Sequence, residues 1–237
     1  MKLSIAGLVD SLKIPPAKVL LPVFEAISNS VQAIEDAHEE NGKITIEILR
    51  ERQLDGMSPS LREHAPIQAI AISDNGIGFT PPNFESFGTG HSTYKRARGG
   101  KGLGRFSWLS VFEEAEIQTA FELKGQSYCM QWTFDLKFEA SAVEPARDCD
   151  SVARITKITM AWVRPSFRDH MPKRVKSIIA RIFQHHYSLF LRPNAPTLTL
   201  VDCGKRLNLD SHFREVLGKP RKRSFKVFDH LFRLIIL

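Results

Sequence analysis

The sequence predicts an α+β protein, because helical and strand periodicities both recur along the chain. Residues 20–37 repeat apolar side chains at helical spacing. That stripe consists of Phe24, Ile27, Val31 and Ile34. Residues 43–50, KITIEILR, alternate apolar and polar side chains as a half-buried strand does. A chain of 237 residues with 43% hydrophobic side chains is long enough to bury a substantial core.

The first half of the chain is expected to combine helices, strands and two long connections. A lead segment over residues 1–19 is predicted to hold a short helix that ends at Ile14-Pro15-Pro16. The elements predicted next are a helix at 20–37, a strand at 43–50, a surface loop at 53–66, a strand that ends at Asp74, an irregular segment at 81–101 and a helix at 103–111. Loops as long as 81–101 inside a domain are usually functional lids or disordered, so these are the two expectations for this segment.

The second half is expected to add strands, one long helix and a basic C-terminal region. Strands are predicted at 115–121, 126–134, 153–161 and 196–201, a turn at 139–150, and a helix at 171–190. Residues 219–223, KPRKR, form a basic run. A further strand begins at Phe225, and its apolar end, LIIL, would leave an exposed edge. We therefore expect that strand to pair with a partner beyond residue 237.

Two glycine-rich motifs are the strongest functional signals. Residues 69–79, AIAISDNGIGF, indicate a short strand that stops on Asp74 and turns through Gly76 and Gly78. Residues 99–108, GGKGLGRFSW, place four glycines around a lysine, and glycine lets a ligand approach the backbone closely. Free N–H groups in such a loop, or at the helix that follows it, bind phosphate. A carboxylate at a strand end together with a phosphate loop suggests a nucleotide held at both ends.

The helix at 20–37 supplies two polar side chains one turn apart. Glu25 and Asn29 are four residues apart and therefore share a face. The amide oxygen of Asn29 can bind Mg²⁺, a cation that prefers oxygen ligands, and Glu25 can deprotonate a water aimed at a phosphate. The alternative for each motif taken alone is a solvated helix face or an ordinary turn.

In this order, the motifs resemble those of the GHKL ATPases, the superfamily of gyrase B subunits, heat-shock chaperones, histidine kinases, MutL and the MORC proteins. The resemblance rests on the ExxxN helix, DNGIGF, the segment STYK at 92–95 and GGKGLGRF. It implies the Bergerat fold, a two-layer α/β sandwich with a mixed sheet under helices and a mobile lid over ATP. We therefore expect a GHKL ATP-binding domain over residues 1–205, with ATP and Mg²⁺ as cofactors.

The resemblance also assigns roles to the matching residues. Glu25 matches the general base and Asn29 the Mg²⁺ ligand. Asp74 matches the acceptor for the adenine amino group, and Gly76 and Gly78 match the turn that packs against the base. The residues expected to contact nucleotide from the lid are Lys95, Gly100, Lys101, Gly102, Leu103, Gly104 and Arg105. For the lysines, a solvated loop position is the alternative.

Two positions depart from the family pattern. Thr156, in ARITKIT, resembles the threonine on a later strand that supports the adenine aspartate, although Ile155 stands where the family usually has glycine. Gln32 stands where the family often has an aspartate that braces the turn below the helix.

The C-terminal region and the charge of the chain bear on partners. Residues 206–237 are expected to begin a second, transducer-like domain or a C-terminal extension, in a chain that is a piece of a longer protein. The net charge of +7 permits a nucleic-acid partner, and the basic run at 219–223 could contact a DNA backbone or a protein client. The resemblance implies a homodimer that forms when nucleotide binds.

Composition favours a cytoplasmic protein with no membrane partner. No run of eighteen apolar residues is present, and the first sixteen residues do not form a secretory signal. Cys129, Cys149 and Cys203 are odd in number and widely spaced, with no CxxC pair, so neither a disulfide framework nor a zinc site is predicted.

Three functional classes follow, in order of preference. The first is an ATP hydrolase in which nucleotide closes the lid and drives dimerisation, because a protein that only binds ATP needs no base at Glu25. The second is a nucleotide-sensing module with little turnover that regulates a DNA- or protein-directed effector. The third, a histidine kinase catalytic domain, is least favoured, because His185-His186 lacks the acidic neighbour that a phosphate-accepting histidine usually has.

Overall fold

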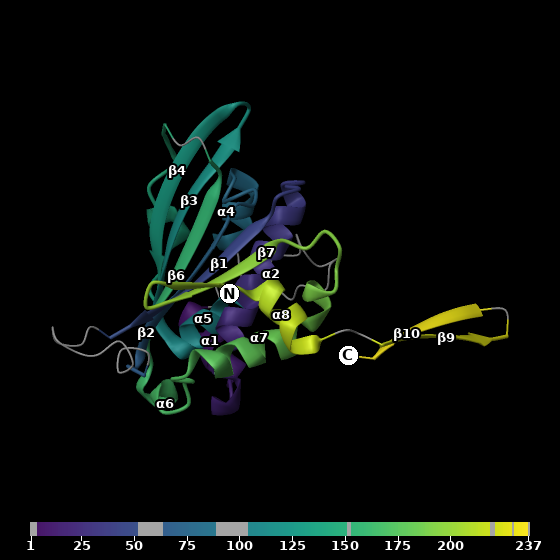
Figure 1. Ribbon diagram of the computed structural model, residues 1–237. Coiled ribbons are helices and arrows are strands. Elements are labelled where there is room, and N and C mark those ends of the chain that lie inside the picture. The colour runs from purple at the N-terminus through teal and green to yellow at the C-terminus, as the bar shows by residue number, and fades with distance from the viewer. Residues whose placement is uncertain are drawn as a thin grey trace.

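A mixed eight-stranded sheet is the centre of the computed structural model, which describes residues 4–51, 64–88, 104–150, 153–218, 221–228 and 230–236 (Figure 1). Its strands are β1 (Lys43–Arg50), β2 (Ile67–Asp74), β3 (Phe112–Leu123), β4 (Gln126–Phe134), β5 (Arg147–Asp148), β6 (Ile155–Val163), β7 (Thr197–Asp202) and β8 (Lys205–Asn208). They lie in the order β5-β4-β3-β6-β2-β1-β7-β8. Within this described sheet, β1 and β7 run parallel and every other neighbouring pair is antiparallel.

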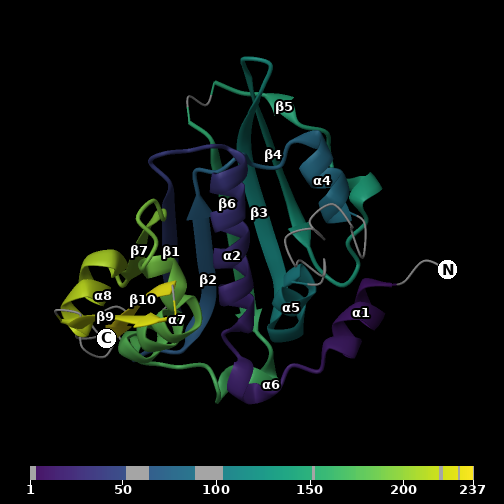
Figure 2. The same cartoon turned by 90° about the vertical axis from the view of Figure 1, so that its right-hand side faces the viewer.

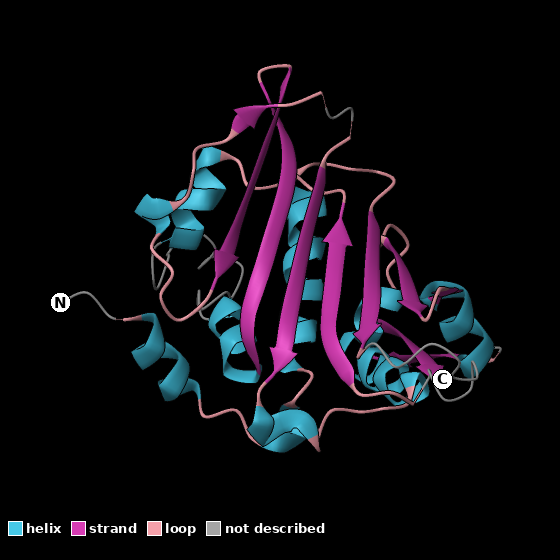
Figure 3. Ribbon diagram, turned by 90° about the vertical axis from the view of Figure 1, so that its left-hand side faces the viewer, coloured by secondary structure: helices cyan, strands magenta, loops and turns pink. Residues whose placement is uncertain are grey.

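Helices cover one face of this sheet, which leaves the other face open to the viewer in Figure 3. They are α1 (Ile5–Leu12), α2 (Leu21–Asp36), α4 (Pro81–Gly88), α5 (Gly104–Val111), α6 (Pro165–Arg168), α7 (Val175–Phe190) and α8 (Leu209–Leu217), with short 3₁₀ turns η1 (Pro16–Lys18) and η3 (Ala140–Ala142). Figure 2 shows α2 lying along the sheet with α5 beside it. The observed class is the predicted one, α+β with a mixed sheet.

The sheet presents ordered rows of side chains to the helices. Ile72, Ile158 and Ile117 stand opposite one another on β2, β6 and β3, and the next row holds Ile70, Met160 and Ala115. These side chains are almost fully buried, so they form an apolar floor under α2. At the end of β2 the row changes character and consists of Asp74, Thr156 and Thr119. A polar row therefore closes the apolar floor at one end of the sheet.

Local contacts fix where the helices begin and end. The Ser4 side chain accepts a hydrogen bond from the Gly7 N–H (3.1 Å) and caps α1. The N–H of Arg164 donates to the carbonyl of Val111 (2.8 Å), and its Nε donates to the carbonyl of Leu109 (2.8 Å). The end of α5 is thereby tied to the segment after β6, which fixes the position of α5 on the sheet.

The predicted elements of the first half are mostly confirmed, with one correction. The helix over residues 20–37 and the strands at 43–50 and before Asp74 are present as α2, β1 and β2. The segment after Pro81 was expected to be irregular, but Pro81–Gly88 forms α4. Thr80 accepts a hydrogen bond from the Phe84 N–H (2.9 Å), and the two prolines that follow Thr80 fit the first turn of a helix. Residues 89–103, which hold the rest of the predicted lid, lie outside the described residues.

The C-terminal region differs from the prediction. The strand expected from Phe225 is part of a hairpin, β9 (Arg221–Val227) and β10 (His230–Ile236), so its partner lies within the chain. The basic run predicted at 219–223 overlaps β9. Residues 205–208 continue the main sheet as β8, and α8, at 209–217, packs against β7. Figure 1 shows the hairpin projecting from the body. The expectation that residues 206–237 begin a second domain stays a prediction.

A disulfide joins Cys129 to Cys149, which corrects the expectation of free cysteines. The two are 20 residues apart, but β5 pairs with β4 so that Cys129 stands opposite Arg147, two residues before Cys149. Disulfides persist mainly in oxidising compartments, so this bond does not favour the predicted cytoplasmic location, which stays a prediction. No helix in the described part of the chain is long and apolar enough to span a membrane.

The disulfide predicts a measurable share of stability. Cys149→Ser should lower the free energy of unfolding by about 3 kcal/mol. The two cysteines are 20 residues apart, and a disulfide that closes a loop of this size restricts the unfolded chain by about that much. Urea unfolding measures the change. Cys203→Ser is the matched control, because Cys203 is exposed and unbridged, and it should leave the unfolding curve in place. Thiol labelling of the unfolded, unreduced protein should modify one cysteine; labelling of three would contradict the bond.

Candidate functional site

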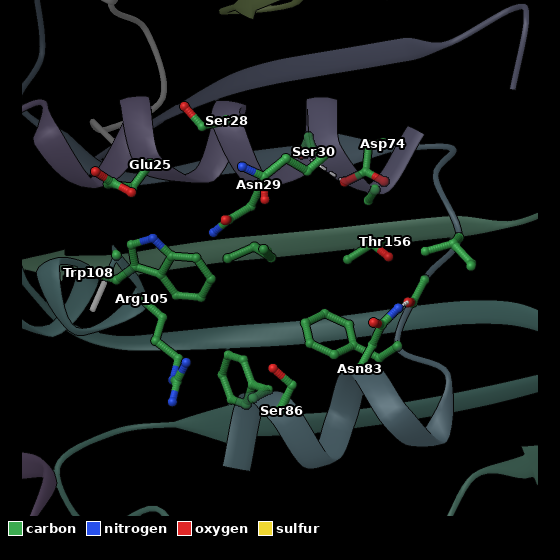
Figure 4. Close-up of a pocket in the computed structure, with 18 residues that line it drawn as sticks. Glu25, Ser28, Asn29, Ser30, Asp74, Asn83, Ser86, Arg105, Trp108 and Thr156 are labelled. Atoms are coloured by element: carbon green, nitrogen blue, oxygen red, sulfur yellow. Dashed lines mark hydrogen bonds between the residues drawn. The ribbon is translucent and has the colours of Figure 1, made fainter. Parts of the chain in front are cut away.

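A cavity of about 210 Å³ lies between α2, α4, α5 and the polar end of the sheet. Its lining includes seven of the predicted site residues, namely Glu25, Asn29, Asp74, Gly78, Gly104, Arg105 and Thr156. Figure 4 shows Asp74 and Thr156 at one end and Glu25 with Arg105 at the other. Lys95, Gly100, Lys101, Gly102 and Leu103 lie outside the described residues. The structure thus brings residues that are up to 131 positions apart in the sequence, Glu25 and Thr156, to one cavity.

Asp74 is a buried carboxylate that accepts hydrogen bonds from Ser30 and from the Gly76 backbone. Its Oδ2 accepts a hydrogen bond from the Ser30 hydroxyl (2.7 Å), and its Oδ1 accepts one from the Gly76 N–H (2.9 Å). It is 6% exposed and ends β2 at the polar row. A carboxylate oxygen has more than one acceptor direction, so Asp74 can still accept a hydrogen bond from a group in the cavity. This is the property that an acceptor for an amino group requires.

The turn after Asp74 is packed directly on α2. The Ile77 N–H donates to the carbonyl of Ala33 (2.9 Å). A Cβ added at Gly76 would lie 2.6 Å from the Ala33 carbonyl carbon, so only glycine fits there. Gly76 therefore lies against the helix and outside the cavity lining, where it sets the distance between α2 and the turn. Its role in the structure is to let two backbones approach.

Gly78 meets the other side of the cavity. Its φ is +75°, and a Cβ added to it would lie 2.8 Å from the Cβ of Phe121 and 3.0 Å from the Thr119 hydroxyl. Asn83 Nδ2, on α4, donates to the carbonyl of Gly78 (3.0 Å). The turn is thus held from the sheet side and from α4 at once.

The Thr156 hydroxyl lies within hydrogen-bond distance of Thr119, a residue that the sequence analysis did not identify. Thr156 stands opposite Asp74 on β2 and opposite Thr119 on β3. The two threonine hydroxyls lie 3.1 Å apart, and the Phe79 N–H donates to the Thr119 hydroxyl (3.3 Å). Thr119 and Ser30 were missed because each is defined by a partner that is distant in sequence.

Glu25 and Asn29 lie on the cavity side of α2, one turn apart as predicted. Burial raises the pKa of the Glu25 carboxyl above its ordinary value. The first residue of α5 approaches it closely, because a Cβ added at Gly104 would lie 2.5 Å from Glu25 Oε2. Glycine at 104 therefore makes room for this carboxylate. A general base needs this combination of a raised pKa and a position at the edge of a cavity.

Arg105 supplies the positive charge at this end. Burial lowers the pKa of Arg105 to about 10, so it stays charged at neutral pH. Its guanidinium lies 5.2 Å from the centre of the Phe87 ring and 4.6 Å from that of Phe106. Stacking on these rings holds the side chain in place. Among the described residues lining the cavity, Glu25, Asp74 and Arg105 carry charge.

A metal ion at this site would need a bound nucleotide to complete its coordination. In the described part of the chain, no three His, Cys, Asp or Glu side chains gather as a metal cluster. Asn29 offers one amide oxygen, so Mg²⁺ bound there would take its other ligands from phosphate and water, as it commonly does. The residues present therefore fit Mg²⁺ carried in with a nucleotide.

Comparison of the chain with protein-family models and with curated proteins found no match.

The glycines at 76 and 104 predict different outcomes for the same substitution. Gly76→Ala should destabilise the protein by about 1–3 kcal/mol, because its Cβ meets the backbone of Ala33. Gly104→Ala should cost much less stability, because the close contacts of its Cβ would be with the carboxylate end of the Glu25 side chain, which can rotate away, and not with backbone. Urea unfolding of both variants measures the difference. Equal losses would contradict the packing of the turn on α2.

Proposed function

We propose that this chain is a GHKL-type ATPase that binds ATP with Mg²⁺ and hydrolyses it. The observation that carries the proposal is that one cavity holds two carboxylates in different surroundings. Asp74, at one end, accepts hydrogen bonds from its neighbours, and Glu25, at the other end, is desolvated. Asn29 lies on the same helix as Glu25 and also lines the cavity. The first arrangement suits recognition of an amino group, and the second suits deprotonation of a water. A site that only bound nucleotide would need the first alone.

Each residue has a role in this proposal. Asp74, supported by Ser30 and the Thr119–Thr156 pair, accepts the adenine amino group. Asn29 provides an oxygen to Mg²⁺. Glu25 takes a proton from the attacking water, and Arg105 adds positive charge at the phosphate end. Mg²⁺, when bound, would neutralise charge on the phosphate oxygens.

The fold supports the proposal at a coarser level. A mixed sheet with helices on one face and the site between them is compatible with a Bergerat fold, which we propose for this domain. In such a domain, lid closure over ATP would drive dimerisation and act on a partner or a downstream domain. The client, whether DNA or protein, is part of this proposal and would engage the basic C-terminal region.

The alternative is a nucleotide-sensing module with little turnover. The same cavity would serve it, and turnover is the property that separates the two. The histidine kinase alternative is disfavoured further. Burial lowers the pKa of His186 to about 4, and the His185 ring stacks on Phe24 at 4.2 Å. The buried His186 is therefore not placed to accept a phosphoryl group from solution.

Asp74→Asn tests nucleotide recognition. An amide presents a donor where the adenine amino group needs an acceptor, so the variant should lose ATP affinity by at least about tenfold. Calorimetric titration with ATP and Mg²⁺ measures this loss. Asn75→Asp is a nearby control, because Asn75 faces β1 and bonds the Lys43 N–H (2.7 Å) outside the cavity lining. Unchanged ATP affinity in Asp74→Asn would refute the assignment of Asp74 as the acceptor for the adenine amino group.

Glu25→Ala tests hydrolysis. The variant should keep ATP binding and lose turnover by about 10²-fold or more, because the water is left without a base. Phosphate release with and without Mg²⁺ measures turnover, and ATP titration of the same variant measures binding. Turnover in the wild type that is lost in Glu25→Ala supports the hydrolase. Binding without turnover in either protein would favour the sensing module.

A further inference from the structure

Trp108 contributes a hydrogen-bond donor to the cavity that the proposed mechanism has not used. Its side chain is 1% exposed and lines the cavity. The indole Nε1–H is sealed from water and has no hydrogen-bond partner among the described residues. A buried N–H without a partner is costly, and native proteins rarely leave one unpaired.

The surroundings of Trp108 identify an acceptor for it. Trp108 is four residues after Gly104 on α5, so both lie on the same face of that helix. At Gly104 this face meets the Glu25 carboxylate, at the 2.5 Å separation given above for an added Cβ. Figure 4 shows the nitrogen edge of the Trp108 indole on the side of the cavity where Glu25 lies. Glu25 therefore presents carboxylate oxygens at the end of the cavity that the indole nitrogen faces.

Glu25 in turn needs a donor. Its carboxylate is desolvated, and a hydrogen bond to the charged form would favour that form. The other charged side chains that line this cavity in the described chain are Arg105, on α5, and Asp74, at the far end. Arg105 stays charged throughout the acid range and so does not itself titrate there.

We infer that Trp108 is a positioning residue for Glu25: its indole N–H donates a hydrogen bond to the Glu25 carboxylate and holds that carboxylate charged and directed into the cavity. The bond itself is a property of the free protein, whereas its effect on hydrolysis rests on the proposed function. It gives a role to the buried indole N–H, which a phenylalanine at this position would lack.

The bond can be detected without nucleotide. The chain has three tryptophans, at 108, 132 and 162, so its ¹H–¹⁵N spectrum contains three indole signals. Trp108→Phe identifies the signal of Trp108 by its loss. That signal should shift with pH as one carboxyl titrates, and the shift should vanish in Glu25→Gln. A Trp108 signal that does not move, or that still moves in Glu25→Gln, overturns the inference.

Trp132 is the matched control. Its Nε1 is also buried without a partner among the described residues, but Trp132 packs against Phe79 and Phe84 and does not line the cavity. Its indole signal, identified by Trp132→Phe, should not follow the titration of Glu25. This control separates a specific bond from a general response of buried indoles to pH.

Kinetics supplies a second readout. Trp108→Phe should lower kcat about tenfold with less than about a twofold change in KM, as expected for the loss of one hydrogen bond to a charged group. Its acid limb of kcat against pH should move to higher pH, because loss of the donor raises the pKa of Glu25. A raised KM with an unshifted pH profile would assign Trp108 a merely structural role. A wild type without turnover would refute the proposed function, and the indole titration would still decide the Trp108–Glu25 pair.

Discussion

The contact between α2 and the turn after β2 is the constraint on which the rest of the site depends. Ala33 accepts the Ile77 N–H, Gly76 lies against the Ala33 backbone, and Ser30 bonds Asp74 one turn earlier on the same helix. Glu25 lies five residues before Ser30, which is about 7.5 Å along the helix axis. Because α2 is a continuous helix, fixing its one end on Asp74 also fixes the position of Glu25. The length of the site is therefore set by one rigid element.

The two cavity carboxylates differ because their surroundings differ. Asp74 receives donors from Ser30 and Gly76, whereas Glu25 is desolvated, with its pKa raised, against the first residue of α5. Two acids with unequal surroundings can divide recognition and proton transfer between them. The aromatic residues contribute to the same division, since Phe87 and Phe106 hold Arg105 at the Glu25 end. The row of Ile72, Ile158 and Ile117 is almost fully buried and lies next to the polar row that holds Asp74.

The sequence predicted what depends on local spacing. The Glu25–Asn29 pair follows from helical periodicity, and the strand that ends at Asp74 follows from an apolar run that stops at a turn. Thr119 could not be found in this way, because its partner Thr156 is 37 residues away and is defined only by the register of β3 on β6. The Cys129–Cys149 bond likewise follows from the pairing of β5 with β4. The helix α4 did carry a local signal, a threonine followed by two prolines, which the surrounding glycine and serine residues outweighed.

The pairing of the strands also indicates that the geometry of the site does not depend on the disulfide. Cys129 stands opposite Ala120, the neighbour of Thr119, and Cys149 precedes Thr156 by seven residues, so the bond lies close to the polar row. Yet the row itself is held by the long β3–β6 ladder, which runs from Phe112 with Val163 to Ala120 with Ile155, and by β2 on its other side. The two-residue strand β5 is the element that depends on the bond. In a reducing compartment, loss of the bond would release β5 from the edge of the sheet. Asp74, Thr156 and Thr119 would keep their register. The geometry of the site is therefore compatible with either compartment, and the disulfide bears on where the protein works without bearing on what the cavity can bind.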